Sequence, residues 1–439
     1  MRTNDCCQGA SSFSRTMVSF MLNSFSLSVF SSGSTIRRIG LLTWVLLLVA
    51  PAVAAQQLPS SLDIGGQIRQ RTQLDDKKDG FESDFDDFHE LRTRLNAGFA
   101  PADRVTTFIQ IQDTRNFGDG GSTLSPPNGT FDLHQAYFKV DDLFDTPFSV
   151  KAGRQKLVYG NQRLIGGVEW SNQARTFDGG VVSYDTEQAT VDVFAARLPP
   201  RFSGNTTGEG SDNLLGVYST WAVAEAQTLE VFAILDNNTR NVAGTNDETQ
   251  LTRFTPGVTL RGSVSQASYQ LEGAYQTGDR GGSTINAYLL SGDADYSFGV
   301  SGSPTVGAGY TRLSGDADSG LDTFDTLFAT NHKFYGYMDF FLSIPNNAQN
   351  GLQDLRVKGS ANLSEKIGVA AKVHHFVEED APSGRPVEAY GQEVDLTLSY
   401  QFADPLSVTV GASSFFPRDA FAPNGDTDYW GYVMTSVNL

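Results

Sequence analysis

The chain has 439 residues, including 44 glycines and 16 prolines, and its 50 acidic against 32 basic residues give a net charge of −18. Nucleic acid is therefore an unfavourable partner, because contact with phosphates needs a basic face. Both cysteines, Cys6 and Cys7, lie at the extreme N-terminus, which excludes disulfides, thiolate metal sites and cysteine nucleophiles from the rest of the chain.

The N-terminal segment has the pattern of a targeting sequence. Arg37 and Arg38 precede the apolar run 39–50, and the small residues Ala52–Ala55 follow. A basic start, a short apolar run and an alanine-rich cleavage site are typical of a secretory signal. The alternative, a transmembrane helix, is disfavoured because such a helix needs about 20 apolar residues.

We therefore expect residues 1–55 to be removed and the mature protein to begin near Gln56. The stretch 1–36 is unusual upstream of a signal, and Met17 and Met21 are alternative start sites. No run after residue 55 is long and apolar enough for a membrane helix. If the mature chain lies in a membrane, it does so as a closed barrel, since only helices and closed barrels satisfy every backbone polar group in lipid.

The mature chain alternates repeatedly between apolar and polar residues, with turns rich in Gly, Asp, Asn, Pro and Ser between the alternating segments. Four of the clearest segments are 91–99, 354–361, 393–402 and 406–413. The full set of alternating segments centres near residues 66, 94, 108, 136, 150, 181, 194, 218, 232, 257, 271, 289, 308, 339, 357, 371, 397 and 409, with a last segment over 429–438. The mean pitch of roughly 21 residues fits a strand of about 9–11 residues plus a turn or loop. We therefore expect about 18 strands, with one of these nineteen segments in a loop.

One face of each predicted strand is apolar and the other is charged or rich in amides. A soluble barrel turns the apolar face inward, whereas a membrane barrel turns it toward lipid, and periodicity alone does not separate the two. The signal segment, the strand number and a hydrophobic content of only 39% favour the membrane, because a wide soluble barrel would need an apolar interior. We predict an all-β fold, a transmembrane antiparallel outer-membrane β-barrel of about 18 strands formed by residues 56–439, with both termini periplasmic.

The stretch from Phe88 to Gly180 carries an ordered set of motifs. They are Leu91–Leu95 (LRTRL), Leu133–Phe138 (LHQAYF), Gly153–Gln155 (GRQ), Tyr159–Gly166 (YGNQRLIG) and Trp170–Gly179 (WSNQARTFDG). In the second half of the chain, Phe324–Phe328 (FDTLF) is followed by His332, Gly336 and Asp339. This order and spacing resembles the alginate-export family of outer-membrane barrels, from about residue 62 to the end.

The resemblance implies an 18-stranded barrel that secretes a polyuronate through an arginine-lined pore gated by loops. Matching of positions within the family makes five arginines candidates for the pore lining: Arg92, Arg94, Arg154, Arg163 and Arg175. Because many members of the family are known only by sequence, the identity of the solute does not carry over with the resemblance.

Strand parity, the alternation of side chains between the two faces of a strand, gives inward-facing candidates independently of the resemblance. The basic ones are Arg69, Arg71, Arg92, Arg94, Arg104, Arg253, Arg261, Arg356, Lys358 and Lys372, and the acidic ones are Asp63, Glu272, Asp354, Glu393 and Asp395. Guanidinium groups in a narrow channel attract carboxylates and bind them through paired hydrogen bonds. The alternative is that these bases neutralise acidic residues on neighbouring strands and stiffen a general porin. Both lines together give the predicted pore lining: Arg92, Arg94, Arg154, Arg163, Arg175, Arg261, Arg356 and Lys358.

Arg154 does not follow from strand alternation. Simple alternation from Phe148, Val150 and Ala152 places its side chain on the lipid face, at a cost of about 2–4 kcal/mol near the middle of the bilayer. A bulge at Gly153 would turn the side chain inward. A position near the rim of the barrel would instead make the cost small.

We expect a channel for a polar, anionic polysaccharide or small anionic solute, with a general or substrate-specific uptake porin as the alternative. An outer-membrane hydrolase is less favoured, because no histidine lies in a recognisable nucleophile motif: His89, His134, His332, His374 and His375. A purely structural barrel would not need a basic lumen. We therefore expect no enzyme and assign no catalytic residue.

The acidic surplus lies mainly in predicted loops, and none of it has the spacing of a calcium-binding EF-hand. We therefore assign no metal and no cofactor. The expected partners are the anionic solute, outer-membrane lipid and lipopolysaccharide, and periplasmic export proteins, in an outer membrane reached through the signal segment.

Overall fold

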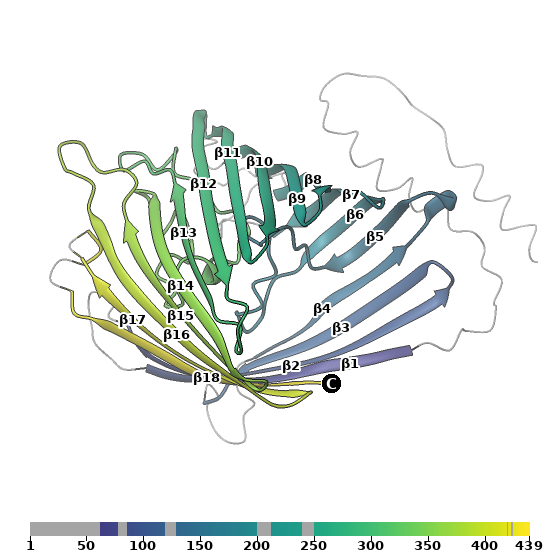
Figure 1. The fold of residues 1–439 in the computed structure, drawn as a ribbon. Helices are drawn as coiled ribbons and strands as arrows, with labels where there is room; N and C mark the ends of the chain where they lie inside the picture. The colour runs from purple at the N-terminus through teal and green to yellow at the C-terminus, as the bar shows by residue number, and fades with distance from the viewer. Residues whose placement is uncertain are drawn as a thin grey trace, which may run out of the picture. The chain divides into compact units, whose positions relative to one another are not determined.

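The computed structural model describes residues 62–77, 86–118, 129–199, 212–238, 250–418, 420–422 and 425–439. The predicted signal segment, residues 1–55, lies outside the described residues. In the described part, eighteen antiparallel strands follow one another in chain order in a single sheet, and the pairing of β1 with β18 closes this sheet into a barrel (Figure 1). The predicted 18-stranded antiparallel barrel is thereby confirmed.

The first nine strands are β1 (Leu62–Asp76), β2 (Asp86–Ala102), β3 (Val105–Asn116), β4 (Gly129–Val140), β5 (Phe148–Gln155), β6 (Phe177–Asp185), β7 (Ala189–Leu198), β8 (Asp212–Ala224) and β9 (Gln227–Asn238). The other nine are β10 (Leu251–Val264), β11 (Ala267–Arg280), β12 (Ser283–Ser297), β13 (Thr305–Leu313), β14 (Leu352–Ser364), β15 (Ile367–Val377), β16 (Ala389–Ala403), β17 (Leu406–Pro417) and β18 (Asp428–Asn438). Two short 3-10 turns, η2 (Leu143–Asp145) and η3 (Asn331–Lys333), lie between strands. Within the described ranges, no helix is long and apolar enough to cross a membrane.

The extra segment among the nineteen predicted ones is the segment centred near residue 339. It lies in the connection between β13 and β14, whereas the other eighteen each fall within a strand. Its apolar residues have another cause, since Met338 and Phe341 are each only 1% exposed and pack inside the barrel.

Alternation along the strands separates an outer face from an inner face. In β16, Leu396 and Leu398 are 51% and 45% exposed on the outer face, while Glu393 and Asp395 are buried on the inner face. The apolar face therefore points outward, as a barrel surrounded by lipid requires.

The connections differ between the two ends of the barrel. At one end, which we call the turn end, the connections are short. Examples are the two-residue turns 103–104 between β2 and β3 and 265–266 between β10 and β11. At the other end, the loop end, the connections are longer, except for Gly281 and Gly282 between β11 and β12. The described chain begins and ends at the turn end, because Gln67 of β1 is paired with Asn438 of β18.

Two long connections fold into the barrel and meet there. The β5–β6 loop (156–176) and the β13–β14 loop (314–351) join through a parallel bridge between Ile165 and Phe328. The amide of Gly166 also donates a hydrogen bond to the carbonyl of Phe328 at 2.8 Å. We call these two loops together the plug.

The hydrophobic core lies between the plug and the inner wall of the barrel. On the wall, the inward positions of β7, β8, β9 and β12 carry large apolar side chains that are at most 1% exposed: Phe194, Leu214, Ile234 and Leu289. Plug residues in the same cluster include Ile165, Phe324, Tyr335 and Phe341. The inner face is therefore polar only in part, and it is apolar where the plug packs against it.

Candidate functional site

Four arginines lie together on the inner face of the first two strands: Arg69 and Arg71 of β1, and Arg92 and Arg94 of β2. Each is at most 5% exposed, and Arg69 lies directly opposite Arg92 in the strand register. Like charges in opposing positions destabilise a sheet, so this cluster needs compensating partners. We call these four residues the arginine wall.

Most of the compensation comes from main-chain carbonyls of the β5–β6 loop. Arg69 donates hydrogen bonds to the carbonyls of Glu169 at 2.7 Å and Ser171 at 3.2 Å. Arg92 donates to the same two carbonyls, each at 3.1 Å. The loop therefore covers the arginine wall, which explains why its charged groups are buried.

Two carboxylates add to these contacts. Glu90 accepts a hydrogen bond from Arg71 at 2.8 Å, and Glu169 forms ion pairs with Arg94 at 2.7 Å and with Lys156. Burial acts to raise the pKa of the Glu169 carboxyl, but Arg94 and Lys156 outweigh it and hold that pKa at about 2. Among the described residues, five cations thus face two carboxylates, and the arginine wall keeps a surplus of positive charge.

Two further arginines hold the plug together. Arg163 of the β5–β6 loop is 1% exposed and donates to Glu272 of β11 at 3.0 Å and to the hydroxyl of Tyr335 at 3.2 Å. Arg175, at the other end of the same loop, donates to the carbonyl of Ala329 in the β13–β14 loop at 3.2 Å. Both side chains therefore connect the two loops, and Arg163 also connects them to the barrel.

A cavity of about 730 Å³ lies between the plug and the inner wall from β9 to β15. Its lining includes Ala226 in the β8–β9 turn, and Ser263 and Ser268 on either side of the β10–β11 turn, so the cavity extends to the turn end. We call this cavity the vestibule. The rest of its lining is Asn161, Arg163, Thr228, Arg261, Gly262, Tyr269, Gln270, Asp293, Asp295, Lys333, Phe334, Tyr337, Arg356, Lys358 and Lys372.

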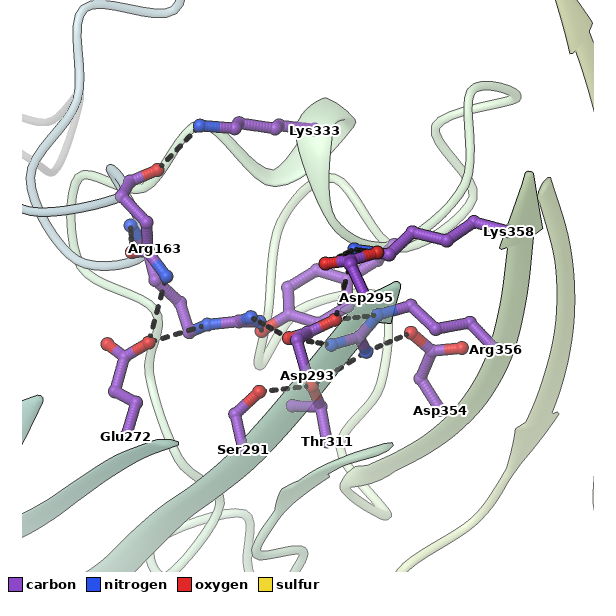
Figure 2. Close-up of polar contacts among 12 residues, drawn as sticks. Arg163, Glu272, Ser291, Asp293, Asp295, Thr311, Lys333, Asp354, Arg356 and Lys358 are labelled. Atoms are coloured by element: carbon purple, nitrogen blue, oxygen red, sulfur yellow. Dashed lines mark hydrogen bonds and ion pairs between the residues drawn. The ribbon is translucent and has the colours of Figure 1, made fainter. Parts of the chain in front are cut away.

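Ion pairs among residues of the barrel strands occupy much of the vestibule wall. Arg356 of β14 lies between Asp293 of β12, with Nε 3.1 Å from Oδ1, and Asp354, with Nη1 2.9 Å from Oδ2 (Figure 2). The ammonium of Lys358 lies 3.0 Å from a carboxylate oxygen of Asp295. These bases are therefore neutralised by carboxylates that the barrel itself supplies.

The structure distributes the predicted pore lining over three places. Arg92 and Arg94 belong to the arginine wall, and Arg163 and Arg175 belong to the plug. Arg261, Arg356 and Lys358 line the vestibule, where Arg261 pairs with Glu230 at 2.6 Å. These seven residues thus all face the interior, but they do not form one ring.

Arg154 differs from this set, because it lies on the outer face of the barrel. It is opposite Asp178 of β6, pairs with it at 3.2 Å and is 41% exposed. The pairing of β5 with β4 and β6 passes Gly153 without a register shift, so no bulge turns the side chain inward in this segment. Its assignment to the pore lining is therefore wrong, and its place one residue from the end of β5 fits the rim alternative. Arg104 is also outside the lumen, in the β2–β3 turn, paired with Asp145 at 2.6 Å.

Two features of the site have no counterpart among the sequence predictions. Main-chain carbonyls accept hydrogen bonds from Arg69 and Arg92, and the residue types at 169–171 carry no signal of that role. Lys333 lines the vestibule from the plug, where strand parity does not apply. The only sequence signal for Lys333 is its position next to His332 in the motif of the second half.

The barrel is similar to several solved structures. It matches Pseudomonas aeruginosa OpdO at 14% identity with a TM-score of 0.60, over 87% of this chain and 98% of that chain. It matches Pseudomonas aeruginosa OccK8 (OprE) at 13% identity with a TM-score of 0.59, over 88% and 99% of the two chains. Acinetobacter baumannii OccAB4 matches at 11% identity with a TM-score of 0.59, over 88% and 100%. At these identities the likeness concerns the fold alone, which is that of outer-membrane porins.

The comparison of sequences is more specific. No protein of curated function matches the chain. The model of the family described as "Alginate export" matches residues 60–432, a range that runs from the start of the barrel into its last strand. The chain therefore belongs to the alginate-export family of outer-membrane β-barrels.

Proposed function

We propose that the protein is an outer-membrane channel for a polar anionic solute, an acidic polysaccharide or a smaller sugar acid. The observation that carries this proposal is the surplus of positive charge on the arginine wall. Arg69 and Arg92 face the lumen, and their hydrogen-bond acceptors are carbonyls of a loop and neutral side chains. The carboxylate that pairs with Arg92, at 3.5 Å, is that of Glu169 in the same loop, which Arg94 and Lys156 share.

A loop carbonyl is a partner that an anionic solute can replace. A carbonyl oxygen is neutral, whereas a carboxylate brings a full negative charge and can bind a guanidinium through two parallel hydrogen bonds. A solute carboxylate can therefore compete with the carbonyls of Glu169 and Ser171 for Arg69 and Arg92. Displacement of the loop uncovers the four guanidinium groups, and the surrounding lipid focuses their field into the lumen, where it favours anions.

The proposal includes a direction of approach. Outer-membrane barrels place their short turns in the periplasm, so we assign the turn end to that side. The vestibule then extends toward the periplasm, and the solute and any periplasmic export partner approach from there. The apolar outer face contacts lipid, with lipopolysaccharide around the loop end.

An uptake porin without strong selectivity is the second candidate. The vestibule wall favours it, because Arg261, Arg356 and Lys358 each pair with a carboxylate of the barrel. A lumen dominated by such pairs has little surplus charge, and its bases then serve rigidity more than selectivity.

The test is the reversal potential of the full-length protein in a planar bilayer under a salt gradient. We expect the wild-type channel to prefer anions, and Arg69→Gln/Arg92→Gln to lose most of that preference while it keeps the heat-modifiable mobility of a folded barrel. Arg104→Gln is the matched control, because it removes an exposed arginine of the β2–β3 turn, and it should behave like the wild type.

Two results would contradict the proposal. One is a wild-type channel with no preference for anions. The other is an unchanged reversal potential in a correctly folded Arg69→Gln/Arg92→Gln variant, which would favour the uptake porin.

A further inference from the structure

Six cations line the vestibule, and two of them differ from the others in their partners. Four of the six pair with carboxylates: Arg163, Arg261, Arg356 and Lys358. In contrast, the ammonium of Lys333 donates to the carbonyl of Asn161 at 3.1 Å, and that of Lys372 donates to the carbonyl of Lys333 at 3.3 Å (Figure 2 shows the first of these). Asp395 of β16 lies opposite Lys372 in the strand register, but among the described residues no carboxylate forms an ion pair with either ammonium.

These two lysines have hydrogen-bonding capacity to spare. Each ammonium carries three N–H donors, and a single carbonyl contact accounts for one of them. Lys333 is exposed and Lys372 is half-buried, so both reach the space of the vestibule. The Nζ atom of Lys372 lies 4.8 Å from the centroid of the Tyr337 ring, a cation–π contact that helps to fix its position. Two such ammonium groups on one cavity can donate hydrogen bonds to a carboxylate.

We propose that Lys333 and Lys372 bind the carboxylate of a single sugar-acid unit in the vestibule, before the plug opens. This site rests on the proposed function for the anionic class of the solute. The neutral polar lining of Asn161, Thr228 and Gln270 suits the hydroxyl groups of a sugar. The volume of about 730 Å³ lies within the range of about 300–1,000 Å³ that is usual for small-ligand pockets.

Occupation of this site acts directly on the plug. The hydrogen bond from Lys372 to the carbonyl of Lys333 ties β15 to η3 of the β13–β14 loop. A carboxylate that takes over the ammonium of Lys372 weakens this tie. The two lysines thus form a recognition step on the turn side of the plug, separate from the arginine wall.

The test is calorimetric titration of the purified full-length protein with galacturonate, glucose and acetate. Galacturonate should bind, glucose should not bind measurably, and acetate should bind more weakly than galacturonate because it lacks the hydroxyl contacts. Lys333→Gln/Lys372→Gln should weaken galacturonate binding about tenfold or more, since a hydrogen bond to a charged group is worth at least a factor of ten. The matched control is Lys366→Gln in the β14–β15 turn. The ammonium of Lys366 likewise donates to a carbonyl, that of Phe402, so its loss should leave binding unchanged.

Folding is checked on the same samples by heat-modifiable mobility, and Lys372→Arg, which keeps the charge, should retain binding within a few-fold. Equal galacturonate affinity in the double variant and the wild type would overturn the site, as would equal affinity for glucose and galacturonate. The reversal potential separates this failure from that of the proposed function. An anion-selective channel with unchanged binding in the double variant rejects the lysine site alone, whereas a non-selective wild-type channel rejects the function on which the site rests.

Discussion

The arginine wall on β1 and β2 and the vestibule wall from β9 to β15 are both basic, but their bases have different partners. Arg69 and Arg92 donate to carbonyls of the β5–β6 loop. Arg356 is held by Asp293 and Asp354, which lie on strands of the barrel itself. The partners on the first wall thus belong to a loop, and those on the second wall belong to strands of the barrel.

This difference separates two roles of lumen charge. Loss of one member of a buried ion pair leaves an uncompensated buried charge, so the vestibule pairs should contribute to the stability of the barrel. A loop carbonyl can move without loss of any strand pairing, so the contacts of the arginine wall can be exchanged for contacts to solute. Substitutions on the vestibule wall should therefore change stability, and substitutions on the arginine wall should change conduction.

The largest expected effect is on the vestibule wall, from Asp354→Ala. Asp354 is 0% exposed, accepts a hydrogen bond from Arg356 at 2.9 Å and contacts His374 at 2.8 Å. Removal of one partner from a buried ion pair costs about 3–5 kcal/mol, and we expect the lower end because Asp293 still holds Arg356. Urea unfolding of the barrel in lipid vesicles measures this change.

The control for that measurement is Asp145→Ala at the turn end. Its pair with Arg104 is exposed and should be worth less than about 1 kcal/mol. Equal unfolding midpoints for the two variants would remove the structural role of the vestibule pairs, and with it the contrast between the two walls.

The sequence predicted the barrel because its outer surface has a simple pattern. Each strand meets lipid on one side, so outward positions such as Leu396 and Leu398 are apolar with period two. The spacing of these segments then gave the strand number. Parity also placed Arg69, Arg71, Arg92 and Arg94 on the inner face, where the structure has them.

The plug could not be predicted in the same way, because it obeys no period. Arg163 and Lys333 lie in loops, and their surroundings depend on how two segments distant in sequence meet at Ile165 and Phe328. The inner wall beneath the plug also departs from the polar expectation, as at Phe194. Most motif residues that carried the family resemblance around 159–179 and 324–339 lie in these loops, which links them to closure of the lumen.

An intermediate effect is expected on the arginine wall, through the charge of Glu169. Burial opposes ionisation, but Arg94 and Lys156 hold the pKa of Glu169 at about 2, below the usual 4.5. A lowered pKa means that the contribution of this carboxylate to closure is complete above pH 4.5 and is lost as pH falls through about 2. Single-channel conductance at rest should therefore stay constant from neutral pH to about pH 4.5 and rise progressively as the pH falls from there to about 2.

Glu169→Gln removes the same charge at every pH and should raise the resting conductance already at neutral pH. Glu187→Gln, in the exposed β6–β7 turn, is the control and should leave the conductance unchanged. A wild-type conductance that stays constant down to pH 2 would mean that the pKa of Glu169 is the same with the loop closed and open, without the hold of Arg94 and Lys156. The β5–β6 loop would then be anchored by its carbonyl contacts alone.

The smallest effect is expected from Arg154→Gln, which lies outside both walls. The pair that Arg154 forms with Asp178 is exposed on the outer face, and such pairs are worth less than about 1 kcal/mol. Its charge is also separated from the lumen by the sheet, so the reversal potential should not move, in contrast to Arg69→Gln/Arg92→Gln in the same bilayers. A loss of anion preference as large as that of the double variant would place Arg154 inside the lumen. The orientation of β5 would then be inverted, and the division of the basic residues into two inner walls and an outer rim would have to be redrawn.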